Sequence, residues 1–437
     1  MYLTYRTPLL VAIGVVPVVL LSPAGVNAWA SMAGWLVLCT AAVLTDAALA
    51  PDPRALRVER RGPRRALLGQ SVVTEIALVN TGGRTVRGRV RDAWQPTAGA
   101  PEARATIAIP PGERRRVAVP LRPRRRGELV SRFVVVRSDG PLGLAGRQAR
   151  IAERGAIRVL PPFTARRHLP SRLARLRELD GNTSVQVRGQ GTEFDSLREY
   201  VRGDDVRSID WRATARSTTT MLRTWRPERD RHVVIVVDTG RTAAARVGDG
   251  VRLDAAMEAA LLLAALASRA GDHVHLLMFD RVTRARVSRV DGPALLPALV
   301  DAMAPVEPQL IDTDWDAAFA QVRSLTSRPS LVVLLTAQDA PEASRGFLGS
   351  LPALAHRAHV LVGTVTDDPE PLADGRDRRP EAADVYRAAA IERATRDAAR
   401  VAAAVGRAGG EAIAASPDLL PPRIADRYLA LKAAGRL

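Results

Sequence analysis

Gly203-Asp204-Asp205-Val206-Arg207 and Ile209-Asp210-Trp211-Arg212 form the centre of a stretch, Gly189 to Thr242, around which the chain is organised. Gly-Asp-Asp is turn chemistry, because glycine accepts a positive φ and aspartate hydrogen-bonds to its own backbone. Acids and arginines then alternate around one large aromatic side chain, Trp211. A solvated loop whose charges pair with one another is the simplest interpretation. The density of specific residue types in so short a span favours a defined structural or docking element instead.

The same stretch ends in an apolar run, His232–Val237, which is closed by Asp238-Thr239-Gly240-Arg241-Thr242. A short, continuous apolar run is typical of a central strand that is covered on both faces. Strands and helices alternate from there onward, so we predict a doubly wound α/β domain over residues 231–437. Ligands of such sheets bind outside the carboxyl ends of the strands, which points to Asp238–Thr242. The other predicted strands are 273–279, 331–335, 360–365 and one after Gly409-Gly410, and the predicted helices are 254–270, 293–303, 314–325, 341–354, 381–407 and 418–434.

No charged residue occurs between Thr7 and Thr45, a distance too long for one membrane-spanning helix of about 20 residues. Turn-forming residues at 22–27 divide it, so we predict two transmembrane helices, at 8–21 and 28–50, in a hairpin of residues 1–53. Arginines flank both spans, whereas the connecting loop has none. By the positive-inside rule we expect a multi-pass protein of the cell membrane with cytoplasmic soluble domains. A signal peptide at Met1–Ala28 would leave those domains on the same side.

Residues 54–162 have the two-residue period of β-strands. The segment 72–79 alternates between two faces, 80–83 is a turn, and further strands are predicted at 85–92, 117–121 and 130–136. An all-β immunoglobulin-like sandwich fits this pattern. The clusters Arg114–Arg116 and Arg122–Arg126 make it strongly basic, which is typical either of a solvated face or of contact with anionic membrane lipid.

The chain of 437 residues has a net charge of +18, carried almost entirely by arginine, and Lys432 is its only lysine. Such a charge favours anionic partners. Aromatic residues make up only 4% of the chain and do not interleave with the arginines, which disfavours nucleic acid as the partner. The single cysteine, Cys39, excludes a disulfide or a cysteine-based metal framework within one chain.

Several of these residues together resemble a family signature. Leu197-Arg198-Glu199-Tyr200, Gly203-Asp204-Asp205, Arg207, Ile209-Asp210-Trp211 and Ala215-Arg216 are similar to the signature of the domain-of-unknown-function-58 family. Asp139-Gly140-Pro141-Leu142-Gly143-Leu144 resembles a second, shorter motif of that family. The resemblance implies a membrane-anchored protein in which the signature region, here 163–230, leads into a von Willebrand factor A-like domain. It also implies a MoxR-type AAA+ ATPase as partner, and it implies no known reaction.

The signature supplies the candidate docking residues. We expect the charged ones to form a single network around Trp211, with Arg198, Asp205, Arg207, Asp210 and Arg216 as its members. The full candidate set is Arg198, Glu199, Tyr200, Gly203, Asp204, Asp205, Arg207, Asp210, Trp211 and Arg216.

The von Willebrand A resemblance also implies a candidate metal site. Such domains take an Asp-x-Ser-x-Ser loop, a threonine from a second loop and a later aspartate, and these hard oxygen ligands suit Mg²⁺. Asp238, Thr242 and Thr313 match three of these positions, whereas Gly240 replaces a serine and Ala337 stands in place of the last aspartate. A degenerate, metal-free loop is the leading interpretation, and a Mg²⁺ site is the alternative.

The chain shows no glycine-rich phosphate fingerprint after its first α/β strand, no Gly-x-Ser-x-Gly and no His-Glu-x-x-His. Together with the family resemblance, this predicts a non-enzymatic, membrane-tethered scaffold without a cofactor. Its von Willebrand A-like domain would dock cytoplasmic partners, which the resemblance implies to be a MoxR-type ATPase in the chaperone-like assembly of a client complex. The first alternative is a membrane-bound binder of anionic partners, lipid or nucleic acid, through the arginine clusters. The second is a metal-dependent hydrolase, which requires Asp238 to converge with Asp204 or Asp205 on one ion.

Overall fold

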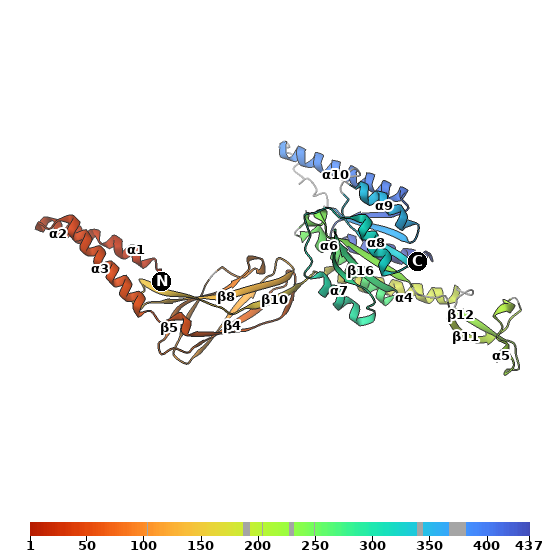
Figure 1. The fold of residues 1–437 in the computed structure, drawn as a ribbon, viewed down its shortest axis with the longest axis horizontal. Helices are drawn as coiled ribbons and strands as arrows, with labels where there is room; N and C mark the ends of the chain where they lie inside the picture. Colours follow the sequence, from red (N-terminus) through yellow and green to blue (C-terminus); the bar gives the residue numbers. More distant parts are fainter. Residues whose placement is uncertain are drawn as a thin grey trace. The chain divides into compact units, whose positions relative to one another are not determined.

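The computed structural model describes residues 1–102, 104–186, 193–202, 204–226, 231–248, 250–338, 344–366 and 382–437. The chain divides into two compact units, Met1–Leu160 and Pro161–Leu437 (Figure 1). Each unit is described by itself.

The N-terminal apolar region forms three helices, α1 (Arg6–Ile13), α2 (Val15–Leu21) and α3 (Ala28–Leu49). Among the described residues one helix, within Ala28–Ala55, has the length and composition to cross a membrane. The first predicted span is not confirmed, because Arg6–Leu21 is shorter and is divided at Gly14. Pro17 has no N–H for the helical hydrogen bond to Ile13, which favours this division. Gly14 also packs tightly on α3, since a Cβ there would lie 2.3 Å from Cδ1 of Trp35.

A buried carboxylate joins α3 to the β-domain. The backbone N–H groups of Leu142, Leu144 and Ala145 donate to the Asp46 carboxylate at 2.7, 2.7 and 2.8 Å. Arg147 Nε donates to the carbonyl of Ala47 at 3.1 Å. The motif 139–144 is therefore a cradle of backbone donors for the last turn of the apolar helix, which gives the short family motif a structural role.

The rest of the first unit consists of two facing sheets. One has the order β2-β4-β7, and in the other the long strand β8 pairs with β5, β9 and β10. Ile76 and Leu78 of the first sheet share one buried cluster with Val90, Val134 and Val136 of the second. The strands are β1 (Tyr2–Leu3), β2 (Leu56–Arg61), β3 (Arg65–Leu67), β4 (Val72–Asn80), β5 (Val86–Trp94), β6 (Ala105–Ile109), β7 (Arg114–Leu121), β8 (Gly127–Asp139), β9 (Ala145–Ile151) and β10 (Gly155–Leu160).

The two arginine clusters of this domain lie at opposite ends of β4. Arg114 pairs with Val79 at the C-terminal end of β4. Leu56, the first residue of β2 after α3, pairs with Asn80 at the same end, so Arg114–Arg116 lie on the α3 side of the sandwich. Leu121 pairs with Val72 at the other end, so Arg122–Arg126 begin roughly 25–30 Å away along a strand of this length. Only the first cluster is therefore close to the apolar helix.

The second unit is built on a six-stranded sheet of order β17-β16-β13-β18-β19-β20, in which only β17 is antiparallel (Figure 1). Alternate residues of β13 point to opposite faces, as the apolar run at 232–237 predicts. Val233, Ile235 and Val237 pack under α6 and α11, whereas Val234 and Val236 join the cluster formed with α8, α9 and α10. The sheet is therefore doubly wound, as the sequence predicts.

The predicted α/β elements are present, with ends shifted by a few residues. They are β13 (His232–Asp238), α6 (Arg252–Arg269), β16 (His273–Phe279), α7 (Leu295–Met303), α8 (Trp315–Leu325), β18 (Pro329–Leu335), α9 (Arg345–Ala355), β19 (His359–Val365), α10 (Ala382–Arg407), β20 (Glu411–Ala415) and α11 (Leu420–Ala433). The second unit also contains the helix α4 (Leu169–Gln186). The structure adds elements that the sequence pattern did not predict. They are β11 (Glu193–Glu199), α5 (Trp211–Thr214), β12 (Met221–Arg226), β14 (Arg246–Val247), β15 (Gly250–Val251) and β17 (Thr283–Val287).

The only lysine of the chain is part of a buried ion pair between α11 and the turn after α6. Lys432 Nζ lies 2.9 Å from Asp272 Oδ1, and the two side chains are 8% and 1% exposed. Tyr428 Oη donates to the other carboxylate oxygen at 2.5 Å. Because both donors come from one face of α11, this contact fixes the rotation of the last helix on the sheet.

Three histidines meet at the amino ends of β13 and β16. His232 Nδ1 and His275 Nε2 are 2.9 Å apart, and the ring of His232 also stacks on His273 at 5.3 Å between centroids. Burial, with repulsion from His232 and His273, lowers the pKa of His275 from 6.5 to about 4. Asp291 opposes this lowering and Arg286 adds to it.

We predict that the second unit loses stability as the pH falls from about 6.5 to about 4. In this range the unfolded chain binds a proton at His275 that the folded chain does not, so the free energy of unfolding decreases by up to about 3 kcal/mol. Thermal melts of the full chain in detergent at successive pH values measure this. His275→Gln should flatten this part of the profile, whereas His356→Gln, at an exposed position, should leave it unchanged. A profile that His275→Gln does not alter would contradict the assignment.

Candidate functional site

The candidate site lies at the carboxyl end of the sheet, where the strand order reverses. The first strand of this sheet along the chain, β13, lies between the second, β16, and the fourth, β18. Crevices at such reversals are where open α/β sheets bind ligands. Asp238 is the last residue of β13 and is 4% exposed.

Hydrogen bonds from the protein surround the Asp238 carboxylate. Oδ1 accepts from the N–H of Gly240 at 2.8 Å and from the hydroxyl of Thr313 at 2.5 Å. Oδ2 accepts from the hydroxyl of Thr336 at 2.6 Å and, more weakly, from that of Thr242 at 3.4 Å. An ionised carboxylate has about four acceptor directions, and all four are used here. The structure thus brings the three predicted residues, Asp238, Thr242 and Thr313, together.

The residues present do not fit an adhesion-type metal site. A Cβ at Gly240 would lie 2.3 Å from the Thr313 hydroxyl oxygen and 2.9 Å from the carbonyl of Ile311, so a serine here requires the loops to move apart. Ala337, at the position of the expected second carboxylate, is 5% exposed. Among the described residues, no group of three or more His, Cys, Asp or Glu side chains is placed to hold a metal ion. Instead of a metal ion, the hydroxyl groups of Thr313, Thr336 and Thr242 hold the loop after β13 against the neighbouring segments through Asp238.

A second buried carboxylate, that of Asp280, accepts hydrogen bonds at the end of the neighbouring strand β16. Asp280 follows β16 and accepts from the Thr239 hydroxyl at 2.8 Å and from Arg284 Nε at 2.6 Å. Burial alone raises the pKa of Asp280, but the hydrogen bonds from Arg284, from backbone N–H groups and from Thr239 outweigh it and hold that pKa below its usual range. Thr239 directly follows Asp238, the last residue of β13, and it donates to Asp280, the residue after β16. The hydrogen bonds of the two carboxylates therefore form one continuous set that links the ends of β13 and β16.

The family signature folds as a separate two-stranded hairpin. Strands β11 and β12 pair antiparallel, from Glu193 opposite Arg226 to Glu199 opposite Met221. Arg198 Nη2 donates to Asp204 Oδ1 at 2.7 Å, while Asp204 Oδ2 accepts from the N–H of Val201 at 3.0 Å. The hydrogen bond to Asp204 raises the pKa of Arg198. This pair closes the turn that begins after β11.

A second ion pair fixes the segment that carries Trp211. Asp210 is the N-cap of α5 and accepts from the N–H groups of Arg212 and Ala213 at 2.9 and 3.0 Å. Its other oxygen accepts from Arg223 Nε of β12 at 2.7 Å. Hydrogen bonds from Ala213, from Arg223 and from Arg212 lower the pKa of Asp210. Asp210 thus folds the segment back onto β12.

The predicted single charge network is wrong, because the structure forms two separate pairs, Arg198–Asp204 and Arg223–Asp210. Asp205 instead caps the short turn 206–208 through the N–H of Arg207 at 3.0 Å. In the described part of the chain, the side chains of Arg207 and Arg216 make no ion pair. Glu199 accepts from Thr219, the N–H of Tyr200 bonds to Thr220, and Gly203 lies outside the described residues.

Sequence reasoning missed two residues, Thr336 and Arg223. Thr336 follows β18 directly, and a polar residue after a predicted strand at the same edge was the available signal. Arg223 is 13 positions away from Asp210, and only the hairpin register brings the two together. Trp211 itself is 71% exposed, so most of its side chain faces solvent.

We predict that Asp238→Ala destabilises the second unit by about 3 kcal/mol, since it leaves buried hydroxyl and amide donors without an acceptor. Asp238→Asn should cost less, because the threonine hydroxyls can rotate to accept from the new amide. Chemical denaturation of the full chain in detergent measures both. Asp312→Ala is the matched control, since Asp312 lies in the adjacent loop with its side chain 74% exposed and should change stability by no more than about 0.5 kcal/mol. If Asp238→Ala and the control had equal free energies of unfolding, the hydrogen bonds to Asp238 would not stabilise the second unit.

Among known proteins, Uncharacterized protein Rv1480 of Mycobacterium tuberculosis and Uncharacterized protein Mb1516 of Mycobacterium bovis are each 28% identical to this chain over 191 residues. The match covers 43% of this chain and 59% of each relative, so the chain spans somewhat over half the length of these relatives.

Two solved structures are each similar to a part of the chain. The CARDB domain of the PF1109 protein from Pyrococcus furiosus is 19% identical, covers 24% of this chain and 86% of its own, and has a TM-score of 0.19. The SpRpn10 VWA domain is 9% identical, covers 45% of this chain and 94% of its own, and has a TM-score of 0.29.

The family whose model matches is described as Protein of unknown function DUF58, and the match extends over residues 196–405. It begins within the signature hairpin and continues through the doubly wound sheet as far as α10, so the resemblance of the signature residues is confirmed. Over this segment the chain is similar to the DUF58 family.

Proposed function

We propose that this chain is a membrane-tethered scaffold whose signature hairpin docks a cytoplasmic partner protein, foremost a MoxR-type AAA+ ATPase acting on a client complex. The apolar helix α3 would provide the tether, and the arginines that follow it would keep the soluble domains in the cytoplasm, as the positive-inside rule favours. The choice of ATPase rests on the family resemblance, whereas the choice of docking element rests on the hairpin.

The exposed Trp211 is the observation that carries the proposal. Tryptophan is enriched among the residues that dominate protein–protein binding energy. Val201 and Val206, from the same segment between β11 and β12, are 62% and 61% exposed, so this segment presents further apolar side chains to solvent. The ion pairs of Asp204 and Asp210 hold this segment in one conformation, which lowers the entropy lost on binding. An apolar anchor held by charged neighbours fits a groove on a partner protein.

We propose that the Asp238 loop acts without metal and without catalysis. The full set of donors to its carboxylate and the packing at Gly240 support this. The hydrolase alternative requires a second carboxylate at Asp238, yet Asp204 is engaged with Arg198 and Val201. Melts repeated with Mg²⁺ and with a chelator should coincide. A rise in melting temperature with Mg²⁺ that Asp238→Ala abolishes would favour the metal site instead.

Contact with anionic lipid is a second candidate, favoured by the position of Arg114–Arg116 at the α3 end of the sandwich. Arg115 and Arg116 are exposed, and each arginine near an anionic surface contributes about 1 kcal/mol. We expect Arg115→Gln with Arg116→Gln to weaken association of the reconstituted chain with phosphatidylserine head groups, measured by fluorescence quenching. The pair Arg122→Gln with Arg124→Gln, from the other end of the sandwich, is the matched control. Equal quenching by both double variants would remove this candidate.

We predict that Trp211→Ala loses co-purification with the ATPase while the melting temperature of the scaffold stays unchanged, because the side chain is solvent-exposed. Asp210→Ala should lower the melting temperature of the hairpin, since it removes the cap of α5 and strands Arg223. Co-purification from detergent extracts of cells that express both proteins, with a thermal melt of each variant, separates the two effects.

Val282→Ala is the control for Trp211→Ala, because Val282 is 52% exposed on the sheet domain. Retained co-purification with Trp211→Ala would show that the hairpin is not the docking element. Recovery of unrelated proteins alone, with the ATPase demonstrably expressed, would contradict the choice of partner.

A further inference from the structure

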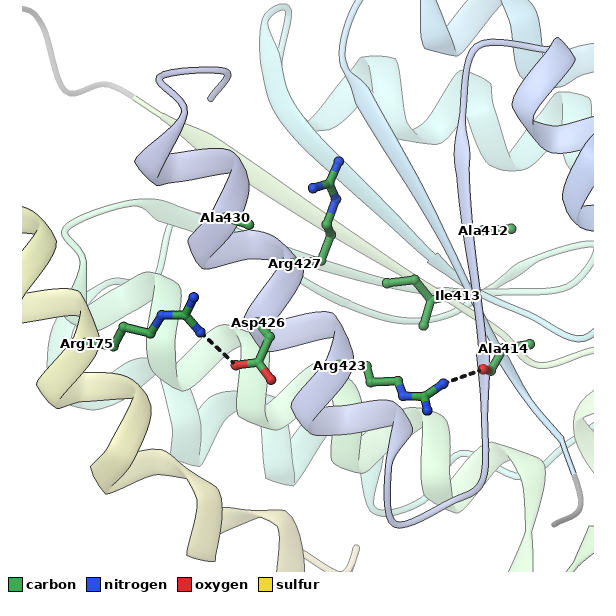
Figure 2. A pocket seen from close by; sticks show the side chains of 8 residues that line it. All are labelled: Arg175, Ala412, Ile413, Ala414, Arg423, Asp426, Arg427 and Ala430. Carbon is green, nitrogen blue, oxygen red and sulfur yellow. Dashed lines mark hydrogen bonds and ion pairs between the residues drawn. The ribbon is translucent and has the colours of Figure 1, made fainter.

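The sheet of the second unit ends in a strand, β20, with a groove beside it. Arg175 of α4, residues 412–414 of β20, and four residues of α11, namely Arg423, Asp426, Arg427 and Ala430, line this groove (Figure 2). Its volume is about 570 Å³. In the part of the chain that the structure describes, β20 pairs only with β19, so its other edge carries no strand.

The register of β20 shows which backbone groups face this edge. The N–H of Thr366 donates to the carbonyl of Ala415, so Ala415 points toward β19. The backbone groups of successive residues in a strand point to opposite sides, so Ala412 and Ala414 point away from β19, toward the groove. One outward carbonyl, that of Ala414, accepts from Arg423 Nη1 at 3.2 Å (Figure 2). The edge therefore presents the outward backbone N–H and C=O groups of Ala412 and Ala414, and Arg423 lies next to them.

The charges around the groove are predominantly positive. Arg172 and Arg175 both approach Asp426, at 2.8 and 3.8 Å, and Arg427 pairs with Glu411 at 2.7 Å. Four arginines thus face two carboxylates, and among the described residues Arg423 bonds to a carbonyl and to no carboxylate. A neutral or basic strand would gain nothing from this excess, whereas an acidic one would neutralise it.

We propose that an extended, acidic segment of a partner protein adds to the edge of β20 as a further strand. Its backbone would pair with Ala412 and Ala414, and its carboxylates would bind Arg423 and Arg427. Edge pairing supplies affinity through the main chain, and the arginines supply the preference for acidic side chains. Small alanine side chains along the strand leave room for the incoming residues. The inference rests on the proposed docking function, but it uses a surface separate from the hairpin.

The test uses a fluorescent peptide that alternates glutamate and valine, bound to the full chain in detergent micelles and measured by anisotropy. We expect saturable binding, weakened roughly tenfold by Arg423→Gln, because one charge-assisted hydrogen bond is lost. Arg323→Gln removes an exposed arginine from the last turn of α8 and should leave the affinity unchanged. Thermal melts verify that both variants are folded.

Two further peptides separate edge pairing from simple charge attraction. The same sequence with N-methylated valines cannot form the strand hydrogen bonds and should bind at least roughly tenfold more weakly. A peptide with lysine in place of glutamate should not bind. Equal binding of the N-methylated peptide, or of the lysine peptide, would overturn the proposal.

The edge could also be covered by a second copy of this chain, and light scattering tests that outcome. A dimer that Ala414→Pro dissociates would assign the edge to self-association and overturn the acidic-partner proposal. Trp211→Ala should retain peptide binding, since the peptide contains no part of the ATPase. Failure of the peptide with intact ATPase co-purification, or the reverse, therefore tells which of the two proposals is wrong.

Discussion

The second unit depends on the buried carboxylate of Asp238. It accepts hydrogen bonds from the loop after β13, from the loop before α8 and from the end of β18, so one side chain fixes three segments that are distant in the sequence. Because it is 4% exposed, each of these donors would be left buried and unsatisfied without it. Where related sheets leave an open crevice for a ligand, this chain places a packed cluster of threonine hydroxyls. The docking surfaces that we propose therefore lie away from this cluster, on the signature hairpin and at the edge of β20.

Buried acids have the same role elsewhere in the chain. Asp46 joins α3 to the loop of the sandwich, Asp92 holds Arg60 at 2.6 Å across its sheets, and Asp272 binds Lys432. In each case the carboxylate is nearly or fully buried and is matched by backbone amides or by one cation. The internal use of acids leaves an excess of arginine on the surface, in a chain that already has 64 basic and 46 acidic residues. A net charge of +18 favours anionic partners.

The elements predictable from the sequence are those whose pattern follows from burial on both faces. The run His232–Val237 could only be a central strand, and the Asp238 loop followed from its position after that strand. Strand β17, Thr-Arg-Ala-Arg-Val, was missed because an edge strand with exposed arginines has no apolar run. The division at Gly14 has a local signal in Pro17, but the close packing of Gly14 on Trp35 is a contact that no local pattern contains. The pairing of Asp210 with Arg223 depends on hairpin register, and nearest-neighbour charge in the sequence suggested Arg207 and Arg216 instead.

The two docking surfaces that we propose, the hairpin and the sheet edge, differ in chemistry because they are held together in different ways. A two-stranded hairpin has too little apolar area for a core of its own, so caps and ion pairs must hold it. Its large apolar side chain, Trp211, is therefore free to be buried by a partner rather than by the hairpin. Strand β20, by contrast, is supported by the core of the domain, and its exposed side consists of backbone and arginine. Under our two proposals, the hairpin would select an apolar groove of its partner and the sheet edge an acidic strand. A partner that buries Trp211 would also stabilise the hairpin by mass action, so docking and folding of the signature are thermodynamically coupled.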